Sequence, residues 1–125
     1  MLPFTVTFRP GNPHYEDIVF AVKRALATGI LREGAPFPSV RTVSRELKLN
    51  PNTCQRAVSV LVDAGILEVR PGVGTFVAKR VPLNFEEALH LLKDPVENLV
   101  VEAKQLGLSE DELHDVVTHS WREIK

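Results

Sequence analysis

The stretch SVRTVSRELKLNPNTCQRAVSVLVDAGILEVRPGVGTFV, residues 39–77, decides the fold of this 125-residue chain. Ser39 begins one helical pattern, because serine is a favoured helix N-cap. Asn50-Pro51 begins a second, because asparagine is also a favoured N-cap and proline is favoured at the first helical position. Residues 66–70 and 75–79 then alternate as two short strands around a glycine-rich turn. Helix, turn, helix and hairpin in this order predict a winged helix-turn-helix.

The residues before this motif predict a strand, a helix and a loop. Residues 4–8 alternate apolar and polar side chains, as in a short edge strand. A helix is expected from residue 13 to 28, with Asn12 as its N-cap and Pro13 at its first position. Residues 34–38 contain two prolines and are expected to form a loop. Together with the motif, they predict a mainly α fold with a small β-hairpin wing.

The chain after the hairpin is expected to be helical. Asn84 and Ser109 each precede a glutamate by three residues, which is the capping-box signature of a helix start. Asp94-Pro95 is expected to interrupt the first of these helices, because proline lacks a backbone donor. The sequence therefore predicts a winged helix-turn-helix domain at residues 1–80 and a short helical dimerisation domain at residues 81–125.

Composition and charge narrow the class of protein. The chain has 44% hydrophobic and 25% charged residues, which is typical of a folded globular protein. It has one cysteine, Cys54, and no apolar run or N-terminal signal pattern, so we expect a cytoplasmic protein without disulfides or membrane spans. Residues 1–80 contain 11 Lys or Arg and 6 Asp or Glu, whereas residues 81–125 contain 4 and 10. This asymmetry favours a polyanion as the partner of the first domain.

Double-stranded DNA is the polyanion that suits this motif, because the second helix of a helix-turn-helix can enter the major groove. Asn52, Gln55 and Arg56 are candidates to read bases, since an amide can bridge adenine and a guanidinium can bridge guanine. Gln55 and Arg56 could instead contact only phosphate or water, and the wing glycines could serve the turn alone. The predicted DNA-binding residues are Ser39, Arg41, Asn52, Thr53, Gln55, Arg56, Arg70, Gly72 and Gly74.

Several of these motifs together resemble those of the GntR family of bacterial repressors. They are Pro38-Ser39-Val40-Arg41, Asn50-Pro51-Asn52-Thr53, Arg56-Ala57, Leu61, Ala64-Gly65 and Gly72-Val73-Gly74-Thr75-Phe76-Val77. The resemblance covers about residues 12–78 and implies DNA contacts by Arg41, Thr53 and a wing glycine. The chain departs from the family pattern at Val40, Ser44 and Cys54.

The short tail is similar to that of the YtrA-like subfamily, through residues 102–109 followed by Glu112-Leu113. That resemblance implies a dimerisation tail and control of a transporter operon. Helices totalling about 40 residues cannot enclose a sizeable core, so their apolar faces must pack on the first domain or on a second copy. We expect a homodimer on a pseudo-palindromic operator. The predicted dimerisation residues are Leu99, Val100, Ala103, Leu106, Leu113, Val117 and Trp121.

Other functions have weaker support in the sequence. Asp115 and His119 are four residues apart, but no third ligand lies near them, so we expect no metal site. Cys54 is expected to be a small core residue. No Ser-His-Asp set, Walker loop or paired-carboxylate motif is present, so we expect no catalysis. We also expect no cofactor. A protein–protein interaction module is the competing class, and a small-molecule effector would have to bind at the dimer interface or between the domains.

Overall fold

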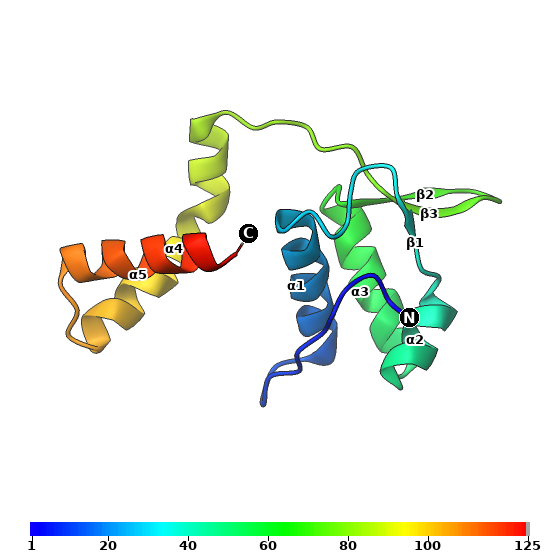
Figure 1. Cartoon of the computed structure of the whole chain (residues 1–125), viewed down its shortest axis with the longest axis horizontal. Coiled ribbons are helices and arrows are strands. Elements are labelled where there is room, and N and C mark those ends of the chain that lie inside the picture. Colours follow the sequence, from blue (N-terminus) through cyan, green and yellow to red (C-terminus); the bar gives the residue numbers. More distant parts are fainter. Residues whose placement is uncertain (125) are drawn as a thin grey trace. The chain divides into compact units, whose positions relative to one another are not determined.

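The computed structural model describes residues 1–124, which divide into an N-terminal unit, residues 1–80, and a C-terminal unit from residue 81 onward. Figure 1 shows the order of the elements. In the N-terminal unit they are α1 (His14–Ala27), β1 (Pro36–Phe37), α2 (Val40–Leu47), α3 (Pro51–Asp63), β2 (Leu67–Arg70) and β3 (Gly74–Val77). In the C-terminal unit they are α4 (Phe85–Gln105) and α5 (Glu110–Glu123). The predicted fold class, mainly α with a small hairpin wing, is confirmed.

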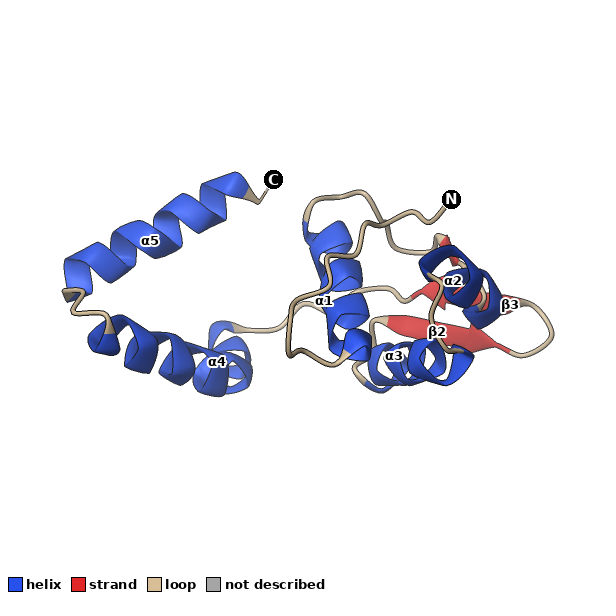
Figure 2. Cartoon of the chain, turned by 90° about the horizontal axis from the view of Figure 1, so that it is seen from below, coloured by secondary structure: helices blue, strands red, loops and turns tan. Residues whose placement is uncertain are grey.

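The core of the N-terminal unit lies between its three helices and the small sheet (Figure 2). Ile18 and Val22 of α1, Val43 of α2, Leu61 of α3 and Leu67 of β2 are each at most 2% exposed. Full burial of a side chain of this size contributes about 1.5–3 kcal/mol relative to exposure. The core therefore holds α3 by its inner face and leaves the outer face uncovered.

The expected caps of α2 and α3 are confirmed. Ser39 Oγ accepts a hydrogen bond from the backbone N–H of Thr42 at 3.1 Å. Asn50 Oδ1 accepts one from the N–H of Asn52 at 2.8 Å, and Pro51 occupies the first helical position. Each cap satisfies an N–H that has no partner within its own helix.

The turn between α2 and α3 is closed by local hydrogen bonds. Lys48 adopts a left-handed conformation with φ of 55°, which ends α2. Ser44 Oγ donates to the carbonyl of Leu49 at 2.6 Å, and the N–H of Leu49 donates to the carbonyl of Ser44 at 3.1 Å. These two bonds fix the direction in which the chain enters α3.

The sheet has three antiparallel strands in the order β1-β3-β2. The two hairpin strands were expected, but the third strand is β1 and not residues 4–8. The prediction of a loop at residues 34–38 was wrong for Pro36 and Phe37, which pair with Phe76 and Thr75 of β3. Sequence reasoning excluded a central strand there, but β1 lies at the edge, where proline is tolerated.

The prediction of a strand at residues 4–8 was also wrong, because this segment has no strand structure. Phe4 is buried and stacks on Phe37, with ring centroids 5.6 Å apart. The alternation therefore reflects an extended segment that places one aromatic ring in the core.

Asn12 does not cap α1, contrary to expectation. Pro13 occupies the N-cap position, and Asn12 Nδ2 instead donates to Asp17 Oδ1 at 2.9 Å. The backbone N–H of Arg9 donates to the second oxygen of Asp17 at 3.1 Å. These two bonds lower the pKa of the Asp17 carboxyl below its ordinary value, and the bond from Asn12 has the larger effect.

In the C-terminal unit, the expected interruption at Asp94-Pro95 was wrong. Helix α4 runs from Phe85 to Gln105 with Pro95 inside it. Proline removes one backbone bond and its ring crowds the preceding turn, which bends a helix rather than necessarily ending it. The change of direction along α4 is visible in Figures 1 and 2. Both predicted capping boxes, at Asn84 and Ser109, are present.

Candidate nucleic-acid interface

The outer face of α3 presents four predicted DNA-binding side chains from its first two turns. Asn52, Gln55 and Arg56 are exposed, and Thr53 is half-buried. Their spacing of three and four residues places them on one side of the helix. Gln55 Nε2 donates to Ser59 Oγ at 3.2 Å, which orients the amide along the helix and leaves its oxygen available. The structure thus brings the four residues together on one surface.

Arg56 contacts a residue that the sequence analysis did not identify. Its Cζ lies 4.0 Å from the centroid of the Tyr15 ring, and Nη2 donates to the Tyr15 hydroxyl at 3.4 Å. Tyr15 belongs to the first turn of α1. The contact joins residues 41 positions apart, so no local pattern in the sequence could have revealed it.

The start of α2 supplies two further predicted residues. Arg41 is exposed in the first turn, where the helix dipole and unpaired N–H groups favour a phosphate. Ser39 is exposed as well, but its hydroxyl accepts from the N–H of Thr42 and lies 3.0 Å from the Thr42 hydroxyl. Ser39 therefore acts as a cap, with one remaining site at which it could contact DNA.

In the wing, Arg70 is held by two neighbours. Its Nη2 lies 2.7 Å from Oε1 of Glu68, and its Cζ lies 4.1 Å from the centroid of the Phe76 ring. Glu68 partly offsets the positive charge that the sequence assigned to this position. Gly72 and Gly74 have φ of 76° and 142°, so the turn itself requires glycine at both positions.

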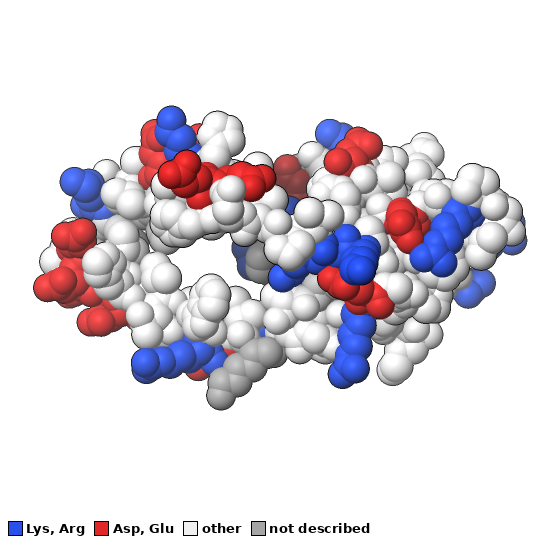
Figure 3. Space-filling model, turned by 90° about the horizontal axis from the view of Figure 1, so that it is seen from above, with Lys and Arg blue, Asp and Glu red and all other residues white. Residues whose placement is uncertain are grey.

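Charge is mixed on both units. On the face drawn in Figure 3, basic and acidic side chains are interspersed on the N-terminal unit, and clusters of acidic side chains lie on the C-terminal unit. The net excess of basic residues in the first 80 positions thus contributes a general positive electrostatic field. Local geometry decides which of the basic side chains are available to bind a phosphate.

The C-terminal unit exposes an apolar surface. Among the predicted dimerisation residues, Trp121 is 81% exposed and Leu106 is 74% exposed. Leu99 and Val117 are exposed too, whereas Val100 and Leu113 are half-buried. Ala103 is 4% exposed and packs within its own chain.

The part of the apolar surface of α4 that precedes Pro95 was missed in the sequence, because a break in the helix was expected there. Along the continuous helix, apolar residues recur at alternating intervals of four and three, the spacing of helices that pair side by side. We name this set the α4 stripe; its members, all exposed, are Phe85, Leu89, Leu92, Val96 and Leu99.

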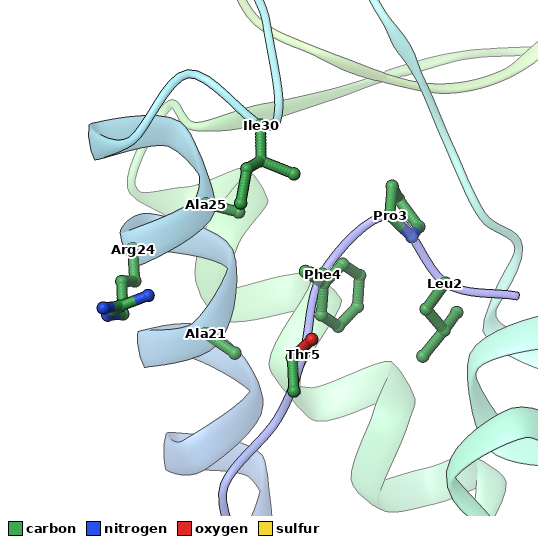
Figure 4. Close-up of a pocket in the computed structure, with 8 residues that line it drawn as sticks. All are labelled: Leu2, Pro3, Phe4, Thr5, Ala21, Arg24, Ala25 and Ile30. Atoms are coloured by element: carbon green, nitrogen blue, oxygen red, sulfur yellow. The ribbon is translucent and has the colours of Figure 1, made fainter. Parts of the chain in front are cut away.

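A pocket of about 310 Å³ lies between the N-terminal segment and α1 (Figure 4). Thr5 and Arg24 supply its polar groups, and the rest of its lining is apolar: Leu2, Pro3, Phe4, Ala21, Ala25 and Ile30. Ligand sites combine an apolar lining with several converging polar groups, and this pocket has too few of them to indicate a ligand. Among residues 1–124, no group of His, Cys, Asp or Glu could hold a metal. No helix within that range is long and apolar enough to cross a bilayer.

Comparison with known families agrees with this geometry. The family model "Bacterial regulatory proteins, gntR family" matches residues 14–77, which run from the start of α1 to the end of β3. The chain therefore belongs to the GntR family, whose members are DNA-binding transcriptional regulators rather than enzymes.

Individual relatives place it within the family. It is 35% identical over 106 residues to the uncharacterized regulator YhcF of Bacillus subtilis, covering 85% of this chain and 88% of YhcF. It is 28% identical over 118 residues to the B. subtilis transcriptional repressor YtrA, covering 94% of this chain and 91% of YtrA. A structure from Listeria monocytogenes, described as a transcriptional antiterminator, superimposes with a TM-score of 0.85 at 26% identity, covering 97% of this chain and 91% of that one. These matches support assignment to the YtrA-like subfamily.

Proposed function

We propose that this chain is a cytoplasmic repressor that binds a pseudo-palindromic DNA operator as a homodimer. In this proposal residues 1–80 bind DNA, residues 81–125 pair two copies, and a bound dimer blocks a promoter sterically. The observation that carries the proposal is the uncovered outer face of α3, where Asn52, Gln55 and Arg56 stand exposed above a fully buried inner face. The resemblance to YtrA-like regulators supports a transporter operon as the target.

DNA contacts are assigned by chemistry. Asn52, Gln55 and Arg56 read base edges in the major groove. Arg41 and Thr53, each in the first turn of a helix, bind phosphates. The wing approaches the duplex through its glycine turn, with Arg70 beside it; the corresponding residues are Arg70, Gly72 and Gly74. Ser39 adds a hydroxyl at the start of α2.

Binding to duplex DNA at increasing salt tests this function. Affinity should fall steeply with salt, because each phosphate contact releases counterions. Arg41→Ala should lower the magnitude of the slope of log K against log salt by about 1. Arg122→Ala, which removes the same charge from α5, is the matched control and should leave the slope unchanged. A flat salt response combined with tight binding to a protein partner would favour the interaction module instead.

The α4 stripe supports the homodimer. Five large apolar side chains lie on one helix face, each at least 40% exposed, and a contiguous apolar patch of this kind is typical of an interaction surface. A second copy of the same helix presents the same spacing, so the two stripes can interlock as helices with seven-residue repeats do. Two subunits paired in this way could present two recognition helices to half-sites about 34 Å apart.

Sedimentation of the full chain tests the pairing. The wild type should sediment as two 13.9-kDa chains, and Leu99→Glu should sediment as one. Val101→Glu is the control: Val101 is also exposed but lies two positions away, on a different side of the helix. If Val101→Glu disrupts the dimer and Leu99→Glu does not, the stripe is not the interface.

A further inference from the structure

Helix α3, the proposed recognition helix, carries an arginine whose guanidinium contacts an aromatic ring of α1. The guanidinium carbon of Arg56 lies 4.0 Å from the ring centroid of Tyr15, within the range of a cation–π contact. Its Nη2 also reaches the Tyr15 hydroxyl, at 3.4 Å. Arg56 is exposed and Tyr15 is half-buried, so the core fixes the ring and the ring fixes the cation at the surface.

We propose that Tyr15 is a positioning residue for DNA recognition, which sets the guanidinium of Arg56 in the orientation that meets the operator. This inference rests on the proposed function and adds a residue from α1 to the DNA-binding site.

The geometry of the pair explains how a stacked arginine can still bind. The five N–H donors of a guanidinium lie in its plane, so a ring against its face leaves donors at the edge free. The contact to Tyr15 occupies one nitrogen, Nη2. The remaining donors can bridge two acceptors of guanine or of a phosphate.

Ordering Arg56 beforehand also strengthens binding. A free arginine has many rotamers and loses that freedom when it docks. The Tyr15 ring already restricts it, so less conformational entropy is lost on binding. A second effect is specificity, because a guanidinium held in one orientation discriminates between bases better than a mobile one.

A purely structural role for the pair is the alternative, since Tyr15 and Arg56 also connect α1 with α3. The N-terminal unit offers a matched pair for comparison. The Cζ of Arg9 lies 5.0 Å from the ring centroid of Phe20, also on α1. Removing the Phe20 ring therefore deletes an arginine–aromatic contact on the same helix without touching Arg56.

The experiment uses the full chain and a duplex that the wild type selects from a random library. Affinity is measured by fluorescence anisotropy, and thermal midpoints are recorded in parallel. Tyr15→Phe keeps the ring and should bind within twofold of the wild type. Tyr15→Leu should bind about threefold to tenfold more weakly. Phe20→Leu should bind as the wild type does.

The decisive result is the coupling between the two residues. The double variant Tyr15→Leu with Arg56→Ala should bind no more weakly than Arg56→Ala alone, because Tyr15 acts through Arg56. On duplexes with single base changes, Tyr15→Leu should lose discrimination at the same position as Arg56→Ala. A loss of stability alone would not produce this match.

Two results would overturn the inference while leaving the proposed function intact. In the first, the fold-losses in DNA affinity of Tyr15→Leu and Arg56→Ala multiply in the double variant. In the second, Tyr15→Leu binds DNA with wild-type affinity. If Tyr15→Leu does not fold, the cycle is run with Tyr15→Met, which fills the volume without a π face. If the wild type selects no sequence at all, the proposed function fails and the inference fails with it.

Discussion

Replacing Glu68 by glutamine should tighten binding to DNA through the wing. The carboxylate of Glu68 lies 2.7 Å from Nη2 of Arg70, and the two side chains are 46% and 50% exposed. A salt bridge this exposed stabilises the fold by less than about 1 kcal/mol, so the substitution should barely change stability. Its effect should appear instead when a phosphate approaches Arg70.

The size of the effect follows from the charges. A phosphate oxygen bound to the same guanidinium would lie about 6 Å from the Glu68 carboxylate, given two contacts of hydrogen-bond length. Two unit charges at that distance repel by about 0.7 kcal/mol at the dielectric constant of water and about 3 kcal/mol at an effective value of 20. Because the wing is exposed, the lower part of this range applies, and Glu68→Gln should raise affinity about threefold to tenfold.

Fluorescence anisotropy across a salt series measures both consequences. With Arg70 released to a phosphate, the slope of log K against log salt should steepen by about 0.9. Asp94→Asn, which makes the same change in net charge on α4, is the control for a general field effect. Equal gains for Glu68→Gln and Asp94→Asn would refute the reasoning, as would a gain that persists when Arg70 is replaced by alanine.

Three further predictions concern the scaffold, and urea denaturation measures each. Leu61→Ala should lower the free energy of unfolding by about 2–5 kcal/mol, because Leu61 is fully buried, whereas Val60→Ala, at an exposed position, should cost much less. Asn50→Ala removes the cap of α3 and should cost about 1 kcal/mol. Asn12→Ala removes the main cause of the lowered pKa of Asp17. A lowered pKa in the folded state stabilises the protein at pH values above the ordinary pKa of 3.8, and this stabilisation is lost as the pH falls below it. The free energies of unfolding of wild type and variant should therefore differ less at pH 3 than at pH 6.

Local signals in the sequence were sufficient for most of the N-terminal unit. Ser39 and Asn50-Pro51 mark helix starts through bonds to residues two or three positions away, and the structure contains those bonds. The glycine-rich turn likewise fixes the hairpin through its own backbone conformation. These features depend on near neighbours along the chain, which is why the order of the three helices and the hairpin could be predicted correctly.

The errors arose where distant residues or competing partners decide the outcome. Phe4 is drawn into the core by Phe37, so an alternating pattern produced no strand. Asn12 has the chemistry of a cap, but the Asp17 carboxylate is its partner instead. Pro95 was read as a break because the rule considers one backbone bond, whereas the surrounding helix retains the rest.

The residues of the candidate site could be predicted from the sequence, but the contacts that their side chains make could not. Exposure of Gln55 and Arg56 follows from helical spacing once the inner face is assigned. Helical spacing does not predict the contact between Arg56 and Tyr15, because that contact crosses from one helix to another. It does not predict the pairing of Arg70 with Glu68 either, because that pairing depends on the strand's twist and on side-chain rotamers. Both contacts change what a cation can offer to DNA, so function depends on details that patterns omit.

Helix α3 separates stability from recognition. Its inner residues, Cys54, Ala57, Val58 and Leu61, are at most 6% exposed and hold the helix in the core. Its outer residues contribute little to that core, so substitutions such as Gln55→Ala should change DNA sequence preference while leaving the free energy of unfolding within about 0.5 kcal/mol. Arg56 is the exception, because its contact with Tyr15 joins the outer face to α1. Of the exposed residues of α3, it is therefore the one at which a change in DNA preference should also carry a change in stability.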